Sequence, residues 1–160
     1  AAPRREIGER GAALVNDTSS MTEIAFEVDE APTTERIQSV IRSLVAFNEA
    51  VAPPENREAV AVFAERSQVL VGGVVGFTHW NWLFVSHLWV DERERGQGVG
   101  TQLMSSIETV GSRRGAIGVH LDTFDFQALP FYERIGFSVF GVLPDYPPGH
   151  SRNFLMKRLG

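Results

Sequence analysis

The spacing of hydrophobic and polar residues changes several times along the chain, and each change predicts a different element of secondary structure. Residues 24–28 alternate between apolar and polar side chains, which predicts a short first strand. A helix is predicted after Pro32, because the next residues can cap its first turn and apolar residues then recur at helical spacing. Its apolar stripe consists of Ile37, Val40, Ile41, Leu44 and Val45.

Three further strands are predicted in the middle of the chain, over residues 58–65, 69–79 and 83–90. Gly72 and Gly73 lie inside the second of these strands and predict a β-bulge. The third strand has the sequence LFVSHLWV and is apolar at both alternating sets of positions. This pattern is typical of a central strand that is covered on both faces.

The rest of the chain alternates between helix and strand. After a polar segment and a glycine-rich stretch, a helix is predicted from an apolar stripe made of Val99, Leu103, Ile107 and Val110. The remaining predicted elements are strands over 117–124, 137–140 and 153–159, a short helix over 127–135 and a rigid proline-rich loop over 144–149. With no repeat and no internal linker, we expect one domain over residues 21–160, preceded by a flexible extension of residues 1–20.

Composition narrows the class of protein. The chain has 160 residues, of which 43% are hydrophobic and 22% are charged, as in a globular protein with a real core. The net charge of −5 gives no reason to expect a nucleic-acid partner, and it favours cations such as protonated amines. Because there is no cysteine, disulfides, thiolate metal sites and a cysteine nucleophile are excluded, which is compatible with a cytoplasmic protein. No apolar run approaches the roughly 20 residues that cross a bilayer, so no membrane partner is expected.

A glycine loop lies between the predicted strand 83–90 and the following helix, with the spacing Arg95-x-x-Gly98-x-Gly100. Glycine lets a backbone approach an anion closely, and a helix that begins there directs unpaired N–H groups at the same place. The loop is not a P-loop, because Thr101 follows in place of lysine, and it lacks the third glycine of a dinucleotide fingerprint. A phosphate or diphosphate is the expected ligand, and a glycine turn without a ligand is the alternative.

With these residues the chain resembles the GNAT superfamily of N-acetyltransferases, in a bacterial and largely uncharacterised subgroup. The phosphate loop of that family is matched by Arg95, Gly98 and Gly100. Its next motif, a strand followed by a helix with an aromatic-Tyr pair and then Gly-Phe, is matched within residues 121–137. The resemblance extends over residues 21–159. It implies a single α/β (α+β) domain, in which helices flank one sheet. Such a domain has a mixed, mostly antiparallel sheet of 6–7 strands, splayed between strands four and five and flanked by about 3–4 helices.

The resemblance also implies a cosubstrate site for acetyl-CoA and no metal. The pantetheine arm is expected against the backbone of Leu88, Trp89 and Val90. The diphosphate is expected on the loop and helix start formed by Arg95, Gly96, Gln97, Gly98, Val99, Gly100 and Thr101. Gln127 stands where many members of the family have asparagine, and it is the candidate for a side-chain contact to the pantetheine arm.

Direct transfer of an acetyl group requires a neutral amine, whereas a lysine-like amine is neutral in only about one molecule in 10³ at pH 7. The resemblance implies that Tyr132 donates to the departing thiolate sulfur. His120 and Asp122 lie on one face of the predicted strand 117–124 and are tentative candidates for the base. Two other histidines, His87 and His79, lie on or near the preceding strands, where a structural role is the more common one.

The sequence therefore predicts an acyltransferase that moves an acetyl group from acetyl-CoA to a primary amine of a small molecule by direct attack. Two alternatives stay open at this point. One is a peptide or protein N-acetyltransferase, and the other is a sensor that binds acyl-CoA without turnover. Exposed edge strands would also be compatible with a homodimer.

Overall fold

The computed structural model describes residues 24–160, which divide into residues 24–41 and the unit Arg42–Gly160. The predicted extension over residues 1–20 lies outside the described part. Helix α1, Thr34–Val51, begins in the first of these parts and ends in the second, and it confirms the helix predicted after Pro32. Thr33 caps it, since the Thr33 hydroxyl oxygen accepts a hydrogen bond from the Arg36 backbone N–H at 3.3 Å.

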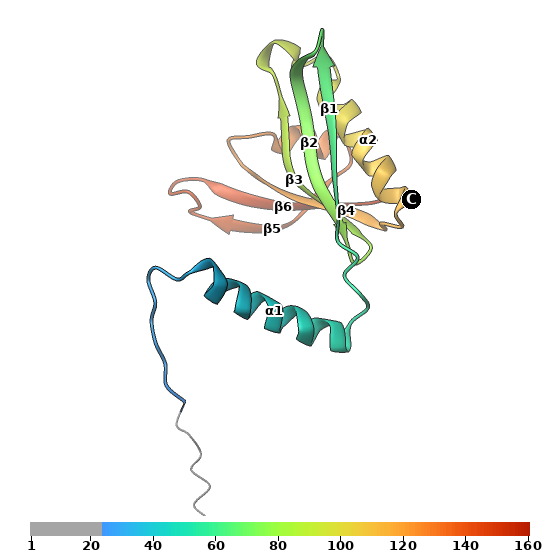
Figure 1. Cartoon of the computed structure of the whole chain (residues 1–160). Coiled ribbons are helices and arrows are strands. Elements are labelled where there is room, and N and C mark those ends of the chain that lie inside the picture. The colour runs from blue at the N-terminus through green and yellow to red at the C-terminus, as the bar shows by residue number, and fades with distance from the viewer. Residues whose placement is uncertain (1–23) are drawn as a thin grey trace, which may run out of the picture. The chain divides into compact units, whose positions relative to one another are not determined.

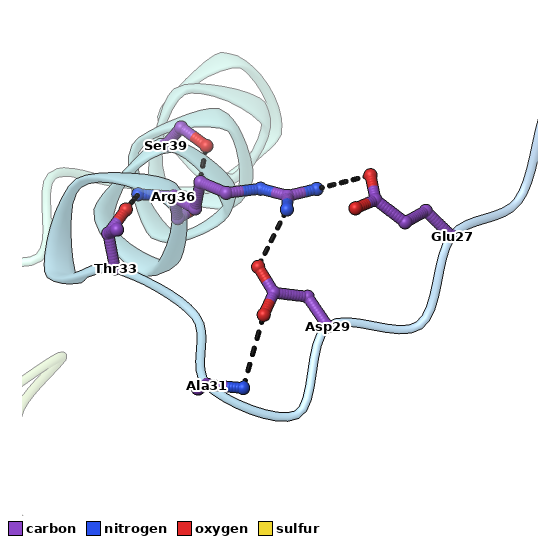
Figure 2. Close-up of polar contacts among 6 residues, drawn as sticks. All are labelled: Glu27, Asp29, Ala31, Thr33, Arg36 and Ser39. Atoms are coloured by element: carbon purple, nitrogen blue, oxygen red, sulfur yellow. Dashed lines mark hydrogen bonds and ion pairs between the residues drawn. The ribbon is translucent and has the colours of Figure 1, made fainter.

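The strand predicted over residues 24–28 is not formed, so this prediction was wrong. Polar side chains fix the segment locally instead. The Arg36 guanidinium contacts Asp29 at 2.7 Å and Glu27 at 3.3 Å, and Asp29 also accepts from the Ala31 backbone N–H (Figure 2). The described residues 24–160 form one sheet, and this segment is not among its strands. Alternation makes a strand only where a partner strand satisfies its backbone.

The unit Arg42–Gly160 is built on one six-stranded sheet. Its strands, in the spatial order β1-β2-β3-β4-β6-β5, are β1 (Glu58–Arg66), β2 (Val69–His79), β3 (Trp82–Val90), β4 (Gly118–Phe124), β6 (Ser151–Arg158) and β5 (Ser138–Pro144). All neighbours are antiparallel except β3 and β4, which are parallel. The prediction of a mixed, mostly antiparallel sheet is confirmed.

Besides the end of α1, this unit contains the short 3₁₀ turn η1 (Glu92–Glu94) and the helices α2 (Val99–Arg113) and α3 (Leu129–Arg134). Helix α2 lies along one face of β1, β2 and β3 (Figure 1). Its predicted apolar stripe is confirmed in part, because Leu103 and Ile107 are buried in the core together with Met104. The glycine loop connects the end of β3 to the start of α2. Because α2 packs on the sheet, the loop lies beside the end of β3.

The β-bulge predicted at Gly72 and Gly73 is displaced. The register of β1 against β2 shifts between Ala64 and Glu65, and that of β2 against β3 shifts between Val75 and Gly76. Gly72 has a different role, since a Cβ there would lie 3.2 Å from the side chain of Leu103. A small residue is needed because α2 packs directly on the strand.

Strands β3 and β4 separate soon after they meet. Only three residue pairs join them, between Leu83–Val85 on β3 and Val119–Leu121 on β4, although β3 continues to Val90 (Figure 1). The predicted splay between the fourth and fifth strands of the sequence analysis is therefore confirmed. The expectation that residues 83–90 are covered on both faces was wrong for the far half of β3, where Ser86, His87 and Trp89 are exposed. The edge of β3 toward β4 is also unpaired beyond Val85.

Candidate functional site

A cavity of about 980 Å³ lies where β3 and β4 diverge. Its wall is formed by the end of β3, the glycine loop, the first turn of α2, the end of β4 and helix α3. Twelve of the fourteen residues singled out from the sequence line it: Leu88, Trp89, Val90, Arg95, Gly96, Gly98, Val99, Gly100, Thr101, Asp122, Gln127 and Tyr132. Gln97 and His120 are the two that do not.

The glycine loop presents backbone rather than side chains to the cavity. Gly96 and Gly98 have φ angles of 73° and 84°, in the left-handed region that glycine adopts without strain. A Cβ on either would meet nothing within 4 Å, so the space beside the loop is open. Gly98 is also the N-cap of α2 and provides no side-chain hydrogen bond to the first turn. The N–H groups that begin α2 are therefore available to an anion.

Polar side chains next to the loop hold its shape. The Arg95 Nε donates to the Val90 carbonyl oxygen at 3.1 Å, which ties the loop to the end of β3. The Gln97 Nε2 donates to the Arg93 carbonyl oxygen at 2.9 Å and so serves the loop itself. Arg95 keeps a positive charge at the cavity wall, whereas the Gln97 side chain is engaged outside the wall.

The far half of β3 has a partner strand on one side alone. Leu88, Trp89 and Val90 pair with Val74, Gly73 and Gly72 of β2. On the other side the described pairing with β4 ends at Val85, so peptide groups along this edge face the cavity. A strand edge of this kind binds an extended ligand through its main chain.

Tyr132 lies on α3 and its ring is packed between those of Phe131 and Phe137, at centroid distances of 5.2 and 5.8 Å. The side chain is 7% exposed and reaches the cavity wall. Burial, together with the negative charge of Asp122, raises the pKa of Tyr132 to about 12. The phenol therefore stays protonated and can act as a hydrogen-bond donor at any physiological pH.

The two tentative bases have different surroundings. Asp122 is held in an ion pair with Arg152, whose Nε and Nη2 lie 2.7 and 2.6 Å from the same carboxylate oxygen. His120 lies outside the cavity wall, with the rings of Phe84 and Trp82 at 4.9 and 6.0 Å. Burial lowers the pKa of His120 against the opposing charge of Asp122, so its imidazole is neutral near pH 7.

The Gln127 side chain closes the end of β4. Its Oε1 accepts hydrogen bonds from the Thr123 hydroxyl and from the Phe124 backbone N–H, each at 3.0 Å. Both contacts use the oxygen, so the Nε2 group is the part of this side chain that remains for a ligand in the cavity.

The cavity also contains residues that the sequence analysis did not assign to the site. They include His87, Glu94, Phe126, Phe131 and Arg134. The His87 Nδ1 lies 3.0 Å from the Ser86 hydroxyl. Because β3 has a bulge at this place, two-residue alternation does not show which face His87 occupies. Phe126 and Arg134 lie within a few residues of recognised motif positions, and proximity to those motifs was the available signal.

No cluster of three or more His, Asp or Glu side chains with the arrangement of a metal site occurs among residues 24–160. Over the same residues, no helix is both long and apolar enough to span a bilayer.

A sheet that opens between two parallel strands, beside a glycine-capped helix, defines the class of acetyltransferases that the sequence motifs resemble. The model of the acetyltransferase (GNAT) family matches residues 22–137, and the chain belongs to this family. It is 43% identical over 105 residues to blasticidin-S acetyltransferase of Streptomyces morookaense, which covers 64% of this chain and 76% of that protein. The chain is therefore an acetyltransferase, as the sequence analysis predicted.

Solved structures agree with this assignment. The crystal structure of an acetyltransferase from Bacillus cereus matches with a TM-score of 0.78 and 31% identity, over 83% of this chain and 98% of that chain. An aminoglycoside 6'-N-acetyltransferase complexed with coenzyme A matches with a TM-score of 0.58 over 85% of this chain and 97% of that chain. Its identity is 20%, so this second likeness concerns the fold alone.

Proposed function

We propose that the protein transfers the acetyl group of acetyl-CoA to a primary amine of a small molecule by direct attack. One observation carries this proposal: the glycine-built start of α2, the open edge of β3 and the Tyr132 side chain all line the same cavity. These are an anion site, a site for an extended amide-bearing arm and a proton donor. Acetyl-CoA has a diphosphate, an amide-bearing pantetheine arm and a thioester, one group for each of these three features.

The residues present fit this cosubstrate. Its diphosphate is held by the N–H groups that begin α2 after Gly98, with the positive charge of Arg95 beside them. Its pantetheine amides pair with the open edge of β3 at the Leu88 peptide groups and the Val90 N–H, since Trp89 faces β2 and the Val90 carbonyl oxygen already accepts from Arg95. The Gln127 Nε2 group, in the turn that follows β4, is a further donor.

Tyr132 stabilises the thiolate that forms when the carbon–sulfur bond breaks. The pKa of Tyr132 is about 12, whereas that of a free thiol is about 8.5, so complete proton transfer from the phenol to sulfur is unfavourable. The hydroxyl instead donates a hydrogen bond to the developing negative charge, which lowers the barrier without a change in its own protonation.

The acceptor is a small cationic molecule. The acidic net charge of −5 favours cations, and the relative from Streptomyces morookaense is named for its action on blasticidin S. Blasticidin S is therefore the first acceptor to test, followed by an aminoglycoside and a polyamine.

The test measures free thiol released from acetyl-CoA with each of these amines and with peptides that carry a free N-terminus. Turnover with a small amine, together with a product one acetyl group heavier, supports the proposal. Turnover with peptides alone would make the protein a peptide N-acetyltransferase, and binding of acetyl-CoA without turnover would make it a sensor. Either result contradicts the proposal.

A further inference from the structure

The side chain of His87 lines the cavity, and its described polar contact is with the Ser86 hydroxyl rather than with a carboxylate. We infer that His87 accepts the proton that the amine must lose before it attacks the thioester. This inference rests on the proposed function, and it assigns a catalytic role to a residue outside the motifs that identify the family.

A chain of two hydrogen bonds sets the tautomer of His87. The Ser86 hydroxyl donates its single proton to the Val75 carbonyl oxygen at 3.0 Å. The same hydroxyl lies 3.0 Å from the His87 Nδ1, so its oxygen must accept there and Nδ1 must carry the hydrogen. In the neutral ring Nε2 is then the unprotonated nitrogen, with its lone pair available as a base.

The position of His87 on β3 suits an incoming amine. The preceding buried residue, Val85, and the following half-buried residue, Leu88, both pack on the core beneath α2. The bulge inserts Ser86 between them, so His87 and the 48% exposed Trp89 lie on the opposite side of the strand. An amine that approaches along this side meets His87 just before the peptide groups that face the pantetheine arm.

The other ionisable groups of the cavity are less suited to take the proton. Asp122 is paired with Arg152 at 2.6 Å. Glu94 is paired with Arg66 at 2.8 Å, and its contact with the Arg66 Nε is 3.0 Å. A carboxylate held in this way loses its ion pair when it is protonated. Tyr132 is already protonated, and the two remaining charged groups of the wall are the guanidinium groups of Arg95 and Arg134.

The reaction then balances in four steps. The ammonium group transfers one proton to the Nε2 of His87 and becomes a neutral amine. Its nitrogen forms a bond to the thioester carbonyl carbon, and the carbon–sulfur bond breaks with its electron pair on sulfur. The second nitrogen proton leaves the tetrahedral nitrogen and ends on the thiolate, which accepts a hydrogen bond from Tyr132 throughout. His87 finally releases its proton to water.

The test compares His87→Gln and His87→Ala with the wild-type protein, using blasticidin S or whichever small amine turns over in the first screen. A general base contributes about 10²–10⁴-fold, so we expect kcat to fall at least about 100-fold in both variants. The affinity for acetyl-CoA, measured by calorimetry, should stay unchanged. Added imidazole should restore part of the rate of His87→Ala, because it can occupy the space of the lost ring.

His79→Gln is the matched control. His79 lies in a separate cavity and is paired with Glu55 at 3.5 Å, so the same substitution there should leave kcat unchanged. Ser86 has a positioning role, and Ser86→Ala should lower kcat about fivefold, the value of one ordinary hydrogen bond. Ser86→Thr keeps the hydroxyl and should restore the rate.

The outcomes separate this inference from the proposed function. If the wild type turns over and the His87 variants remain within threefold of it, His87 is not the base, while the proposed function stands. A large loss that imidazole does not restore would also overturn the assignment, because it indicates a structural role. If the wild type transfers acetyl to none of the small amines, the proposed function itself fails and the inference fails with it.

Discussion

Replacement of Tyr132 by phenylalanine tests the chemistry of the site most directly. The hydroxyl is removed from a ring that is 7% exposed and packed by Phe131 and Phe137, so the packing is preserved. The pKa of Tyr132 is about 12, about 3.5 units above that of a free thiol. At 1.36 kcal/mol per unit, complete proton transfer would cost about 5 kcal/mol, which leaves the hydrogen bond as the contribution of this residue.

A hydrogen bond to a charged group contributes about 1.5–3 kcal/mol, so kcat should fall about 10- to 150-fold in Tyr132→Phe. The affinity for acetyl-CoA should change little, because the bond strengthens only as the thiolate forms. The assay is thiol release with both substrates saturating, corrected for hydrolysis without enzyme. Tyr146→Phe is the matched control, since this second tyrosine is 48% exposed and lies outside the cavity wall.

The pH dependence of kcat provides a second test of the role of Tyr132. With a pKa of about 12, only about 3% of Tyr132 is ionised at pH 10.5, whereas an ordinary tyrosine with a pKa of 10 would be about three-quarters ionised. The wild-type kcat should therefore show no loss between pH 9 and about 10.5. A loss of less than threefold in Tyr132→Phe, or a wild-type decline centred near pH 10, would refute this account of the site.

Two other predictions concern the glycine loop and the half-buried His120. Gly98→Ala places a side chain at a φ of 84°, so it should destabilise the fold by about 1 kcal/mol and also weaken the binding of coenzyme A. Gly115→Ala is the control. It has a similar φ of 82° at the other end of α2 and should destabilise the fold alone. Equal affinities in calorimetry would disprove a role for the loop in binding. Because burial lowers the pKa of His120, the unfolded chain binds a proton below pH 6.5 that the folded protein does not, so the free energy of unfolding should decrease as the pH falls from 6.5. Urea titrations of the wild type and of His120→Gln should show this decrease in the wild type and a smaller one in the variant.

Much of the fold could be predicted because its elements carry local signals. The strand predicted over residues 69–79 has the same limits as β2, and the stripe that begins at Val99 predicted α2. The strand over residues 24–28 was predicted wrongly, since alternation describes one strand and says nothing about a partner. The exposure of Trp89 was also missed, because a run of apolar residues does not show what packs against each face of a strand.

In the candidate site, too, features with a local sequence signal could be predicted, and features that depend on distant segments could not. The glycine loop was found because its spacing is local, and most residues expected around it line the cavity. The surroundings of the titratable groups depend on contacts between distant segments, such as that of Asp122 with Arg152, 30 residues further along the chain. The hydrogen-bonded chain that fixes the tautomer of His87 requires a bulge and a carbonyl oxygen of the neighbouring strand. Neither can be deduced from residue types.

The separation of β3 from β4 also limits what can enter the gap. The outer edge of a sheet accepts any polypeptide strand, and proteins commonly protect such edges against aggregation. The exposed edge of β3 is an inner one, because β4, β6 and β5 continue the sheet beyond the gap. A strand that paired with this edge would have to enter between β3 and β4, whereas a chain with a few amide groups needs to pair with only part of it. The sheet can thus expose unpaired main chain for a ligand without offering a template on which copies of the protein could polymerise.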